Sequence, residues 1–163
     1  MSLQKISPCL WFDHQAEEAA NFYVAIFKNS KILNIARYGE AGAKVSGRPH
    51  GSVMTVTFQL DGQEFMGLNG GPIFTFSPAI SLIVHCETQQ EMDQLWTKLS
   101  ADPAAEQCGW LKDKYGVSWQ IVPAILSHMM LDKDATKSER VMQAMLLMKK
   151  LDIKTLKQAY DQK

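Results

Sequence analysis

The fold is decided by Ile6-Ser7-Pro8-Cys9-Leu10-Trp11-Phe12, a short apolar stretch that returns as Ala79-Ile80-Ser81-Leu82-Ile83-Val84-His85. An amphipathic helical pattern follows each copy at the same spacing, and a hairpin strand closes each copy, over residues 61–66 and 115–120. The sequence therefore predicts two copies of one strand–helix–strand–hairpin unit, over residues 6–70 and 79–123. Equivalent side chains of the two copies are expected around a pseudo-two-fold axis, where a site can form.

Residues 124–163 have a different pattern, that of helices with one apolar side. Their apolar positions are Val141, Met142, Met145, Leu146, Met148, Leu151, Ile153 and Leu156. We interpret this methionine-rich stripe as core or subunit contact; a ligand surface and a docking site for a protein partner are the alternatives. With 163 residues and 46% hydrophobic content, the whole chain 1–163 is expected to form a single domain, because two repeats this short must share one core.

The charge balance argues against two classes of partner. Lys plus Arg and Asp plus Glu number 17 each, so no net charge attracts nucleic acid or an anionic membrane. The three cysteines show no CxxC spacing, which favours free thiols in a reducing, cytoplasmic setting. No secretory signal pattern is present, and no apolar stretch approaches the ~18 residues that span a bilayer. We therefore expect a soluble protein with no nucleic-acid or membrane partner.

Local patterns predict the remaining elements. A helix is expected over residues 15–28 with Asp13 as its N-cap, and another over 88–100 with Thr88 as its N-cap. Strands are expected over 31–38, 52–60, 64–68, 79–86, 106–112 and 117–122, and residues 39–51 are expected to form a loop. Asp61-Gly62 lies between two alternating runs and is a strong hairpin signal.

Alternation along the strands separates two faces of each predicted sheet. The apolar set is expected under the helices and comprises Ile80, Leu82, Val84, Cys86, Val117, Trp119 and Ile121. The mixed set on the other side includes Thr55, Thr57, Ser81, His85, Ser118 and Gln120. Apolar walls with a few polar groups are typical of small-molecule pockets, so we expect the mixed faces to line a concave site.

One stretch carries a family resemblance. Gly109-Trp110-Leu111-Lys112-Asp113-Lys114-Tyr115-Gly116-Val117-Ser118-Trp119-Gln120-Ile121-Val122-Pro123 is similar to the signature of the PhnB-like group, which is labelled as a 3-demethylubiquinone-9 3-methyltransferase domain. With paired βαβββ modules, the chain resembles the vicinal oxygen chelate superfamily of glyoxalases, bleomycin-resistance proteins and dioxygenases. The resemblance implies an α+β glyoxalase/bleomycin-resistance fold with a C-terminal helical extension, sheets that curl around a cup, and a homodimer.

The resemblance also indicates where a metal would bind. In the metalloenzyme branches, the first and last strands of each module supply His or Glu ligands, and the equivalent positions here are Pro8, Met66, Ser81 and Gln120. Proline has no side-chain donor, and a thioether, a hydroxyl and an amide are poor partners for Mn, Fe, Ni or Zn. The sequence therefore predicts no metal ion and no other cofactor.

The chemically active candidates are few. His85 and Glu64 are a possible base and acid pair, or else solvated residues at the rim. His50 lies in a glycine-rich loop, where it can close over a ligand or remain a surface residue. The predicted ligand-binding residues are Ser81, Ser118, Gln120, Met66, Thr55, Thr57, Trp110 and His50. Ser118 and Gln120 are the strongest of them, with the alternative that they satisfy each other or water.

Two functions are compatible with these residues. The leading one is a metal-free protein that binds a small, partly apolar molecule, by analogy to the drug-sequestering branch of the superfamily. The alternative is a metal-dependent lyase, isomerase or dioxygenase-type enzyme with a non-standard site. Methyl transfer from S-adenosylmethionine is not supported, because the first strand runs into Phe12-Asp13-His14-Gln15-Ala16 without a glycine-rich turn.

Overall fold

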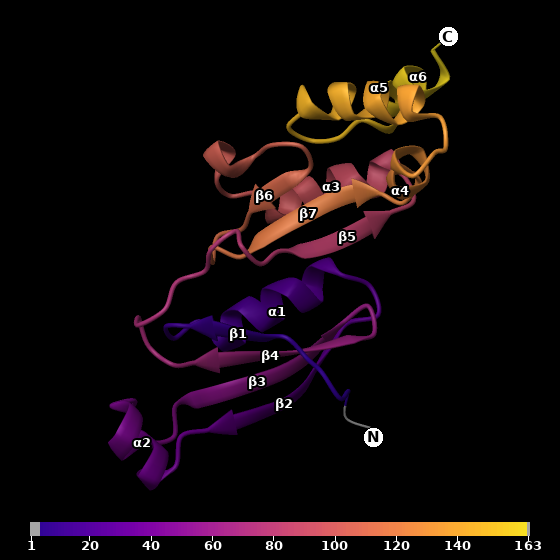
Figure 1. Cartoon of the computed structure of the whole chain (residues 1–163). Helices are drawn as coiled ribbons and strands as arrows, with labels where there is room; N and C mark the ends of the chain where they lie inside the picture. The colour runs from indigo at the N-terminus through magenta and orange to yellow at the C-terminus, as the bar shows by residue number, and fades with distance from the viewer. Residues whose placement is uncertain (1–3, 163) are drawn as a thin grey trace. The chain divides into compact units, whose positions relative to one another are not determined.

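A computed structural model describes residues 4–162 of the chain (Figure 1). The chain divides into two compact units, the first ending at Phe76 and the second beginning at Ser77. Each unit has its own sheet and its own helices, and each is described by itself.

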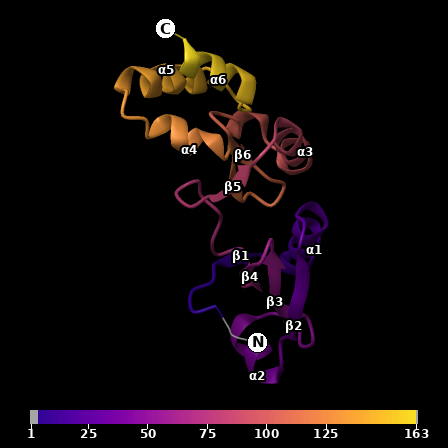
Figure 2. The ribbon, with the colours of Figure 1, turned by 90° about the vertical axis from the view of Figure 1, so that its right-hand side faces the viewer.

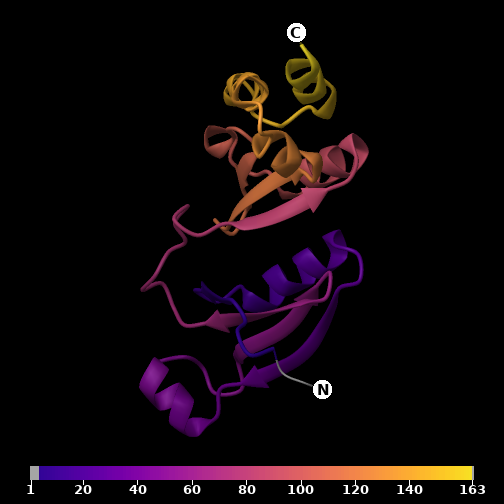
Figure 3. The same ribbon diagram turned by 45° about the vertical axis from the view of Figure 1, so that its right-hand side comes forward.

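The first unit is the predicted βαβββ module. It runs in the order β1 (Cys9–Phe12), α1 (Ala16–Ile26), β2 (Lys31–Arg37), α2 (Glu40–Ser46), β3 (Val53–Leu60) and β4 (Gln63–Asn69). The strand order is β1-β4-β3-β2, with β1 parallel to β4 and the other neighbours antiparallel. Helix α1 lies across one face of this sheet (Figure 3).

Helix α1 packs closely on the sheet because it presents alanines to it. Ala16, Ala19 and Ala20 are fully buried. A Cβ placed on Gly67 of β4 would lie only 3.2 Å from the Cβ of Ala16, so the glycine allows this approach. Tyr23 completes the buried side of the helix, and its ring stacks on Phe58 of β3 with 6.2 Å between the centroids. Among the described residues of this unit, no helix covers the opposite face of the sheet.

The second unit repeats the pattern with one strand fewer among its described residues. It runs β5 (Leu82–Cys86), α3 (Gln89–Leu99), a 3-10 turn η1 (Pro103–Ala105), β6 (Trp110–Lys112) and β7 (Ser118–Pro123). The strand order is β5-β7-β6, with β5 parallel to β7 and β6 antiparallel to it. Helix α3 packs on this sheet through Met92, Leu95 and Leu99.

The predicted helical extension consists of α4 (Ile125–Met130), α5 (Ala135–Leu146) and α6 (Ile153–Asp161). Figures 1 and 2 show α5 and α6 side by side, where Arg140 donates to the carbonyl oxygens of Ala159 and Tyr160 at 2.9 and 3.1 Å. Of the methionine-rich stripe, Val141, Leu151 and Leu156 are fully buried, whereas Leu146 is 55% exposed. Its three methionines are half-buried.

Two predicted segments differ from the structure. The predicted loop 39–51 contains α2, a short helix with no buried residue that ends at Gly47 in the left-handed region (φ 71°). The predicted strand 106–112 is broken by a turn at Cys108-Gly109, with φ values of 50° and 86°. The Cys108 and Gly109 amides donate to the carbonyl oxygens of Met148 and Lys149, far along the chain. A Cβ on Gly109 would lie 3.1 Å from the Ile121 carbonyl oxygen, so glycine suits this close approach.

The start of β5 is a third difference. The strand begins at Leu82 rather than at residue 79, and Ile80 is 80% exposed instead of lying under the helix. The other apolar positions of this strand keep the predicted side, and Cys86 is fully buried. Among the described residues, no helix has the length and apolar character needed to cross a membrane.

Candidate functional site

The sheet face opposite α1 carries the predicted polar residues of the first unit. We call it the first open face; it comprises Cys9, Trp11, Thr55, Thr57, Glu64, Met66 and Leu68. The strand register sets Thr57 beside Met66 and Thr55 beside Leu68, and paired residues point to the same side of a sheet. Met66 is 38% exposed, which leaves a thioether at the surface of this face.

The sheet face opposite α3 forms the equivalent surface of the second unit. This second open face comprises Ile83, His85, Trp110, Lys112, Ser118, Gln120 and Val122. The register places Trp110 beside Gln120 and Lys112 beside Ser118. His85 lies beside Val122 near the end of β5 and is exposed. Glu64 belongs to the first unit and His85 to the second, so the acid–base pair stays a prediction.

The family-implied metal positions do not fit a metal ion. The Gln120 side-chain amide donates to the Ser81 hydroxyl at 2.8 Å, so these two groups satisfy each other. Met66 lies beside Cys9 in the register, and Cys9 follows Pro8, which offers no side-chain donor. Within residues 4–162, no three His, Cys, Asp or Glu side chains gather closely enough to hold a metal ion. The donor set is a thioether, a hydroxyl and an amide, which divalent transition metals do not favour.

A cavity of about 560 Å³ lies against β6 and the start of β7. This volume falls within the roughly 300–1,000 Å³ that is usual for small-molecule pockets. Trp110, Leu111 and Pro78 supply apolar wall, and Gln107, Cys108, Lys112 and Ser118 supply polar or sulfur groups. Of the predicted ligand-binding residues, Trp110 and Ser118 therefore meet in one cavity, whereas Gln120 does not line it.

A larger groove of about 850 Å³ lies between the start of α3 and α6. Its lining is formed by Glu87, Thr88, Gln89, Lys154, Lys157, Gln158, Asp161 and Gln162, with Ile153 as its single strongly apolar residue. Gln89 is already engaged, since its amide accepts from the Ile153 N–H at 2.9 Å and donates to the Leu151 carbonyl at 3.1 Å. The groove is lined mainly by charged and amide residues and has no aromatic residue, whereas the smaller cavity has Trp110 and Leu111 in its lining, so the smaller cavity is the better small-molecule site.

Comparison with known proteins decides the family. The family model described as 3-demethylubiquinone-9 3-methyltransferase matches residues 4–122. A solved structure, the putative 3-demethylubiquinone-9 3-methyltransferase PhnB protein from Bacillus cereus, is 44% identical, covers 74% of this chain and 100% of its own length, and has a TM-score of 0.62. The chain belongs to the PhnB-like 3-demethylubiquinone-9 3-methyltransferase family.

One more distant structure shares the fold of this PhnB-like chain, and a second one matches it more weakly. Protein PA1353 from Pseudomonas aeruginosa is 20% identical, with 75% of this chain and 98% of that chain covered and a TM-score of 0.55. The fosfomycin resistance protein FosX from Listeria monocytogenes is 10% identical, with 74% of this chain and 93% of that chain covered and a TM-score of 0.45. A comparison with curated proteins gave no match. The α+β glyoxalase-type fold and the PhnB-like family that the sequence predicts are confirmed.

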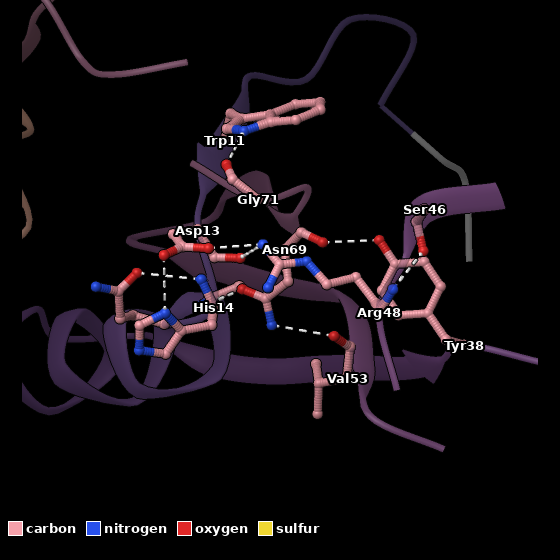
Figure 4. Close-up of polar contacts among 11 residues, drawn as sticks. Trp11, Asp13, His14, Tyr38, Ser46, Arg48, Val53, Asn69 and Gly71 are labelled. Carbon is pink, nitrogen blue, oxygen red and sulfur yellow. Dashed lines mark hydrogen bonds and ion pairs between the residues drawn. The ribbon is translucent and has the colours of Figure 1, made fainter. Parts of the chain in front are cut away.

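Residues at the end of β4 form a polar junction in the PhnB-like chain (Figure 4). We call it the Asn69 corner; it comprises Trp11, Asp13, Tyr38, Arg48, Asn69, Gly70 and Gly71. The Asn69 side chain accepts from the Ala16 N–H at 2.8 Å and donates to the Val53 carbonyl at 3.0 Å. Asn69 therefore caps α1, and the predicted cap, Asp13, does not. The Asp13 carboxylate binds Arg48 at 2.6 Å instead.

The two glycines of the Asn69 corner allow close packing of Trp11 and Arg48. The Trp11 indole N–H donates to the Gly71 carbonyl at 2.8 Å, and its ring occupies the space where a Cβ on Gly70 would lie. Gly71 has φ 95°, and a Cβ there would lie 2.7 Å from the Arg48 guanidinium. Arg48 comes from the segment after α2, so the corner ties that segment to β1. His50, two residues further on, is exposed.

Replacing Arg48 with methionine should weaken the first unit more where Asp13 is ionised than where it is protonated, because Arg48 also donates to the Asp13 backbone carbonyl at 2.8 Å. The hydrogen bond from Arg48, with a smaller one from His14, holds the pKa of the Asp13 carboxyl below its ordinary 3.8. Because the folded pKa is lowered, the stabilisation is present above that value and is lost as the pH falls through the folded pKa. The difference in urea midpoint between wild type and R48M should shrink below pH 3.8. A difference that is constant with pH would assign the effect to packing.

Asp113 organises the second part of the PhnB-like signature. Its carboxylate is 3% exposed. One oxygen accepts from the N–H groups of Tyr115 and Val117 at 2.9 and 3.0 Å, and the other accepts from the Trp119 indole at 2.8 Å. The stretch 113–119 is therefore a turn built around one buried carboxylate.

The sequence analysis missed Lys112 and Cys108 as cavity residues. Lys112 is two residues from Trp110 and lies opposite Ser118 in the register. Strand alternation was therefore the signal that could have placed Lys112 on the same sheet face as Trp110. Cys108 reaches the cavity because of the turn at Cys108-Gly109, which the predicted continuous strand did not include.

Proposed function

We propose that this protein binds a small, partly apolar organic molecule, without a metal ion, in the cavity beside β6 and β7. The observation that carries the proposal is the lining of that cavity, which combines the apolar residues Trp110, Leu111 and Pro78 with the polar residue Ser118. Small-molecule sites combine apolar and aromatic wall with a few directed polar groups in this way.

The residues of this chain do not support the methyl-transfer chemistry in the family's name. The 44% identical Bacillus cereus protein is itself described as a putative methyltransferase. In this chain, Gly70 and Gly71 hold Trp11 and Arg48 closely and follow a strand rather than open a helix. The first strand leads to α1 through Asp13, His14 and Gln15, with no glycine. Methyl transfer is therefore not part of the proposal.

The test uses N-phenyl-1-naphthylamine, a neutral apolar probe that fluoresces when it leaves water. We expect saturable binding to the full chain, unchanged after dialysis against a chelator, in protein whose metal content has been measured. Trp110→Ala should weaken binding about tenfold, which corresponds to about 1.4 kcal/mol, because a large aromatic wall is lost.

Trp96→Ala is the matched control, since Trp96 is a half-buried tryptophan of α3 outside the cavity. Its probe affinity should equal that of wild type. Absence of saturable binding, or equal affinity of the Trp110 variant and wild type, would contradict the proposal. A stoichiometric metal that is needed for probe binding would favour the alternative, a metal-dependent lyase, isomerase or dioxygenase-type enzyme. The homodimer and the cytoplasmic location stay predictions.

A further inference from the structure

Lys112 is the single charged side chain among the described residues that line the cavity. It lies on β6, two residues from Trp110 and opposite Ser118 in the register, so its ammonium group, the indole ring and the hydroxyl belong to one face. The Lys112 side chain is 37% exposed, and water therefore still reaches it.

The partner of Lys112 lies outside the cavity lining. Its ammonium nitrogen is 3.4 Å from an Asp102 carboxylate oxygen, and the Asp102 side chain is 41% exposed. The other Asp102 oxygen accepts from the Ala104 N–H at 3.1 Å, which fixes Asp102 at the start of η1. A long, exposed ion pair of this kind contributes little to stability. Lys112 can therefore exchange Asp102 for an anion in the cavity at small cost.

No carboxylate lines the cavity among the described residues, so its electrostatic preference is set by Lys112. The lysine ammonium binds carboxylate, sulfonate and phosphate groups as a point charge. Resting on the proposed function, the geometry points to a more specific ligand class: small organic anions, in which an apolar body lies against Trp110 and an anionic group binds Lys112 with the Ser118 hydroxyl beside it.

A matched pair of probes isolates the charge. 8-Anilino-1-naphthalenesulfonate has the same fused ring and anilino group as N-phenyl-1-naphthylamine and adds one sulfonate. The full-length wild-type protein should bind the sulfonate probe several-fold more tightly than the neutral probe at low ionic strength. That advantage should diminish with added NaCl because the ion pair is partly exposed, whereas the neutral probe should show no such loss.

The variants assign the effect to one side chain. Lys112→Met keeps the aliphatic stem and should weaken the sulfonate probe about tenfold while changing the neutral probe less than about twofold, as expected for loss of one charge-assisted bond. Lys112→Arg should retain most of the preference. Lys133→Met is the matched control, because Lys133 is an exposed lysine of the same unit outside the cavity, and it should leave both affinities unchanged.

The outcomes separate the two proposals. If neither probe binds saturably, the proposed function fails. If both bind with equal affinity and equal salt dependence, the binding site stands and the anion preference is wrong. If Lys112→Met weakens both probes alike, Lys112 supports the cavity structurally and the anion preference is again wrong. Should that variant not fold, the salt dependence of the wild-type pair and the Lys112→Arg affinities decide the same question.

Discussion

Replacing Asp113 with alanine should lower the free energy of unfolding by about 3–4 kcal/mol. The carboxylate is almost fully buried and accepts from two backbone N–H groups and from the Trp119 indole. Removing it leaves three donors without this acceptor in a site that water enters poorly, and each such donor costs on the order of 1–3 kcal/mol before relaxation. Urea unfolding, followed by far-ultraviolet circular dichroism, measures the loss as a lower midpoint.

Two further variants make the Asp113 result specific. Asp113→Asn keeps an acceptor but turns an amide N–H₂ toward one of the donors, so its loss should be smaller. Asp134→Ala is the matched control: Asp134 is exposed and accepts from one backbone N–H, that of Thr136 at 3.0 Å, as the N-cap of α5. Its loss should be about 1 kcal/mol. If Asp113→Ala costs no more than this control, the buried carboxylate does not organise the turn.

Gly70→Ala should destabilise the protein by about 3 kcal/mol, through a steric conflict. The added Cβ would lie 2.1 Å from Cζ2 and 2.4 Å from Cε2 and Cη2 of Trp11, atoms of a rigid ring. Relief requires the ring to move, which breaks its hydrogen bond to the Gly71 carbonyl, and overpacking with a lost bond costs about this much. Thermal and urea unfolding of the purified variant test the prediction.

Gly39→Ala is the matched control for this substitution. Gly39 precedes α2, has a negative φ of −81°, and has no atom within 4 Å of an added Cβ. The control should therefore be within about 0.5 kcal/mol of wild type. Adding Trp11→Leu to the Gly70 variant should recover part of its loss, because the two positions are in direct contact. Equal stability of the Gly70 and Gly39 variants would contradict the packing role of Trp11.

Features that depend on neighbouring residues were predictable from the sequence. Thr88 caps α3 by accepting from the Glu91 N–H at 3.2 Å, as its position before the apolar run indicates. Asp61 and Gly62 adopt the positive φ values, 44° and 86°, that the predicted hairpin turn requires. In β3 the alternation correctly separates buried Val56 and Phe58 from the open face. Each signal is contained within a few residues of chain.

Features that depend on distant residues were not predictable in this way. The N-terminal turn of α1 is capped not by the expected Asp13 but by the side-chain amide of Asn69, which is 53 residues from the Ala16 N–H that it accepts from. The break in the strand 106–112 is held by carbonyl groups of Met148 and Lys149, in the segment between α5 and α6. No local propensity encodes either partner, because each exists only after the chain has folded.

The same distinction between local and distant signals applies to the candidate site. Alternation was enough to place Trp110 and Ser118 on one face, and both line the cavity. It could not show that Gln120 would be bound to Ser81. It also did not single out Lys112, which the signature-like stretch presents only as one charged residue among several.

The cap on α1 has a consequence for the order in which the first unit folds. The N-terminal turn of that helix obtains its side-chain acceptor from Asn69, at the end of the last strand of the unit. A chain that has only α1 and β2 in place lacks that acceptor, and short isolated helices are marginal in water. The first turn of α1 therefore gains this acceptor only when Asn69, at the end of β4, has been placed beside it. During synthesis, residue 69 must therefore emerge from the ribosome before the first turn of α1 can form this hydrogen bond.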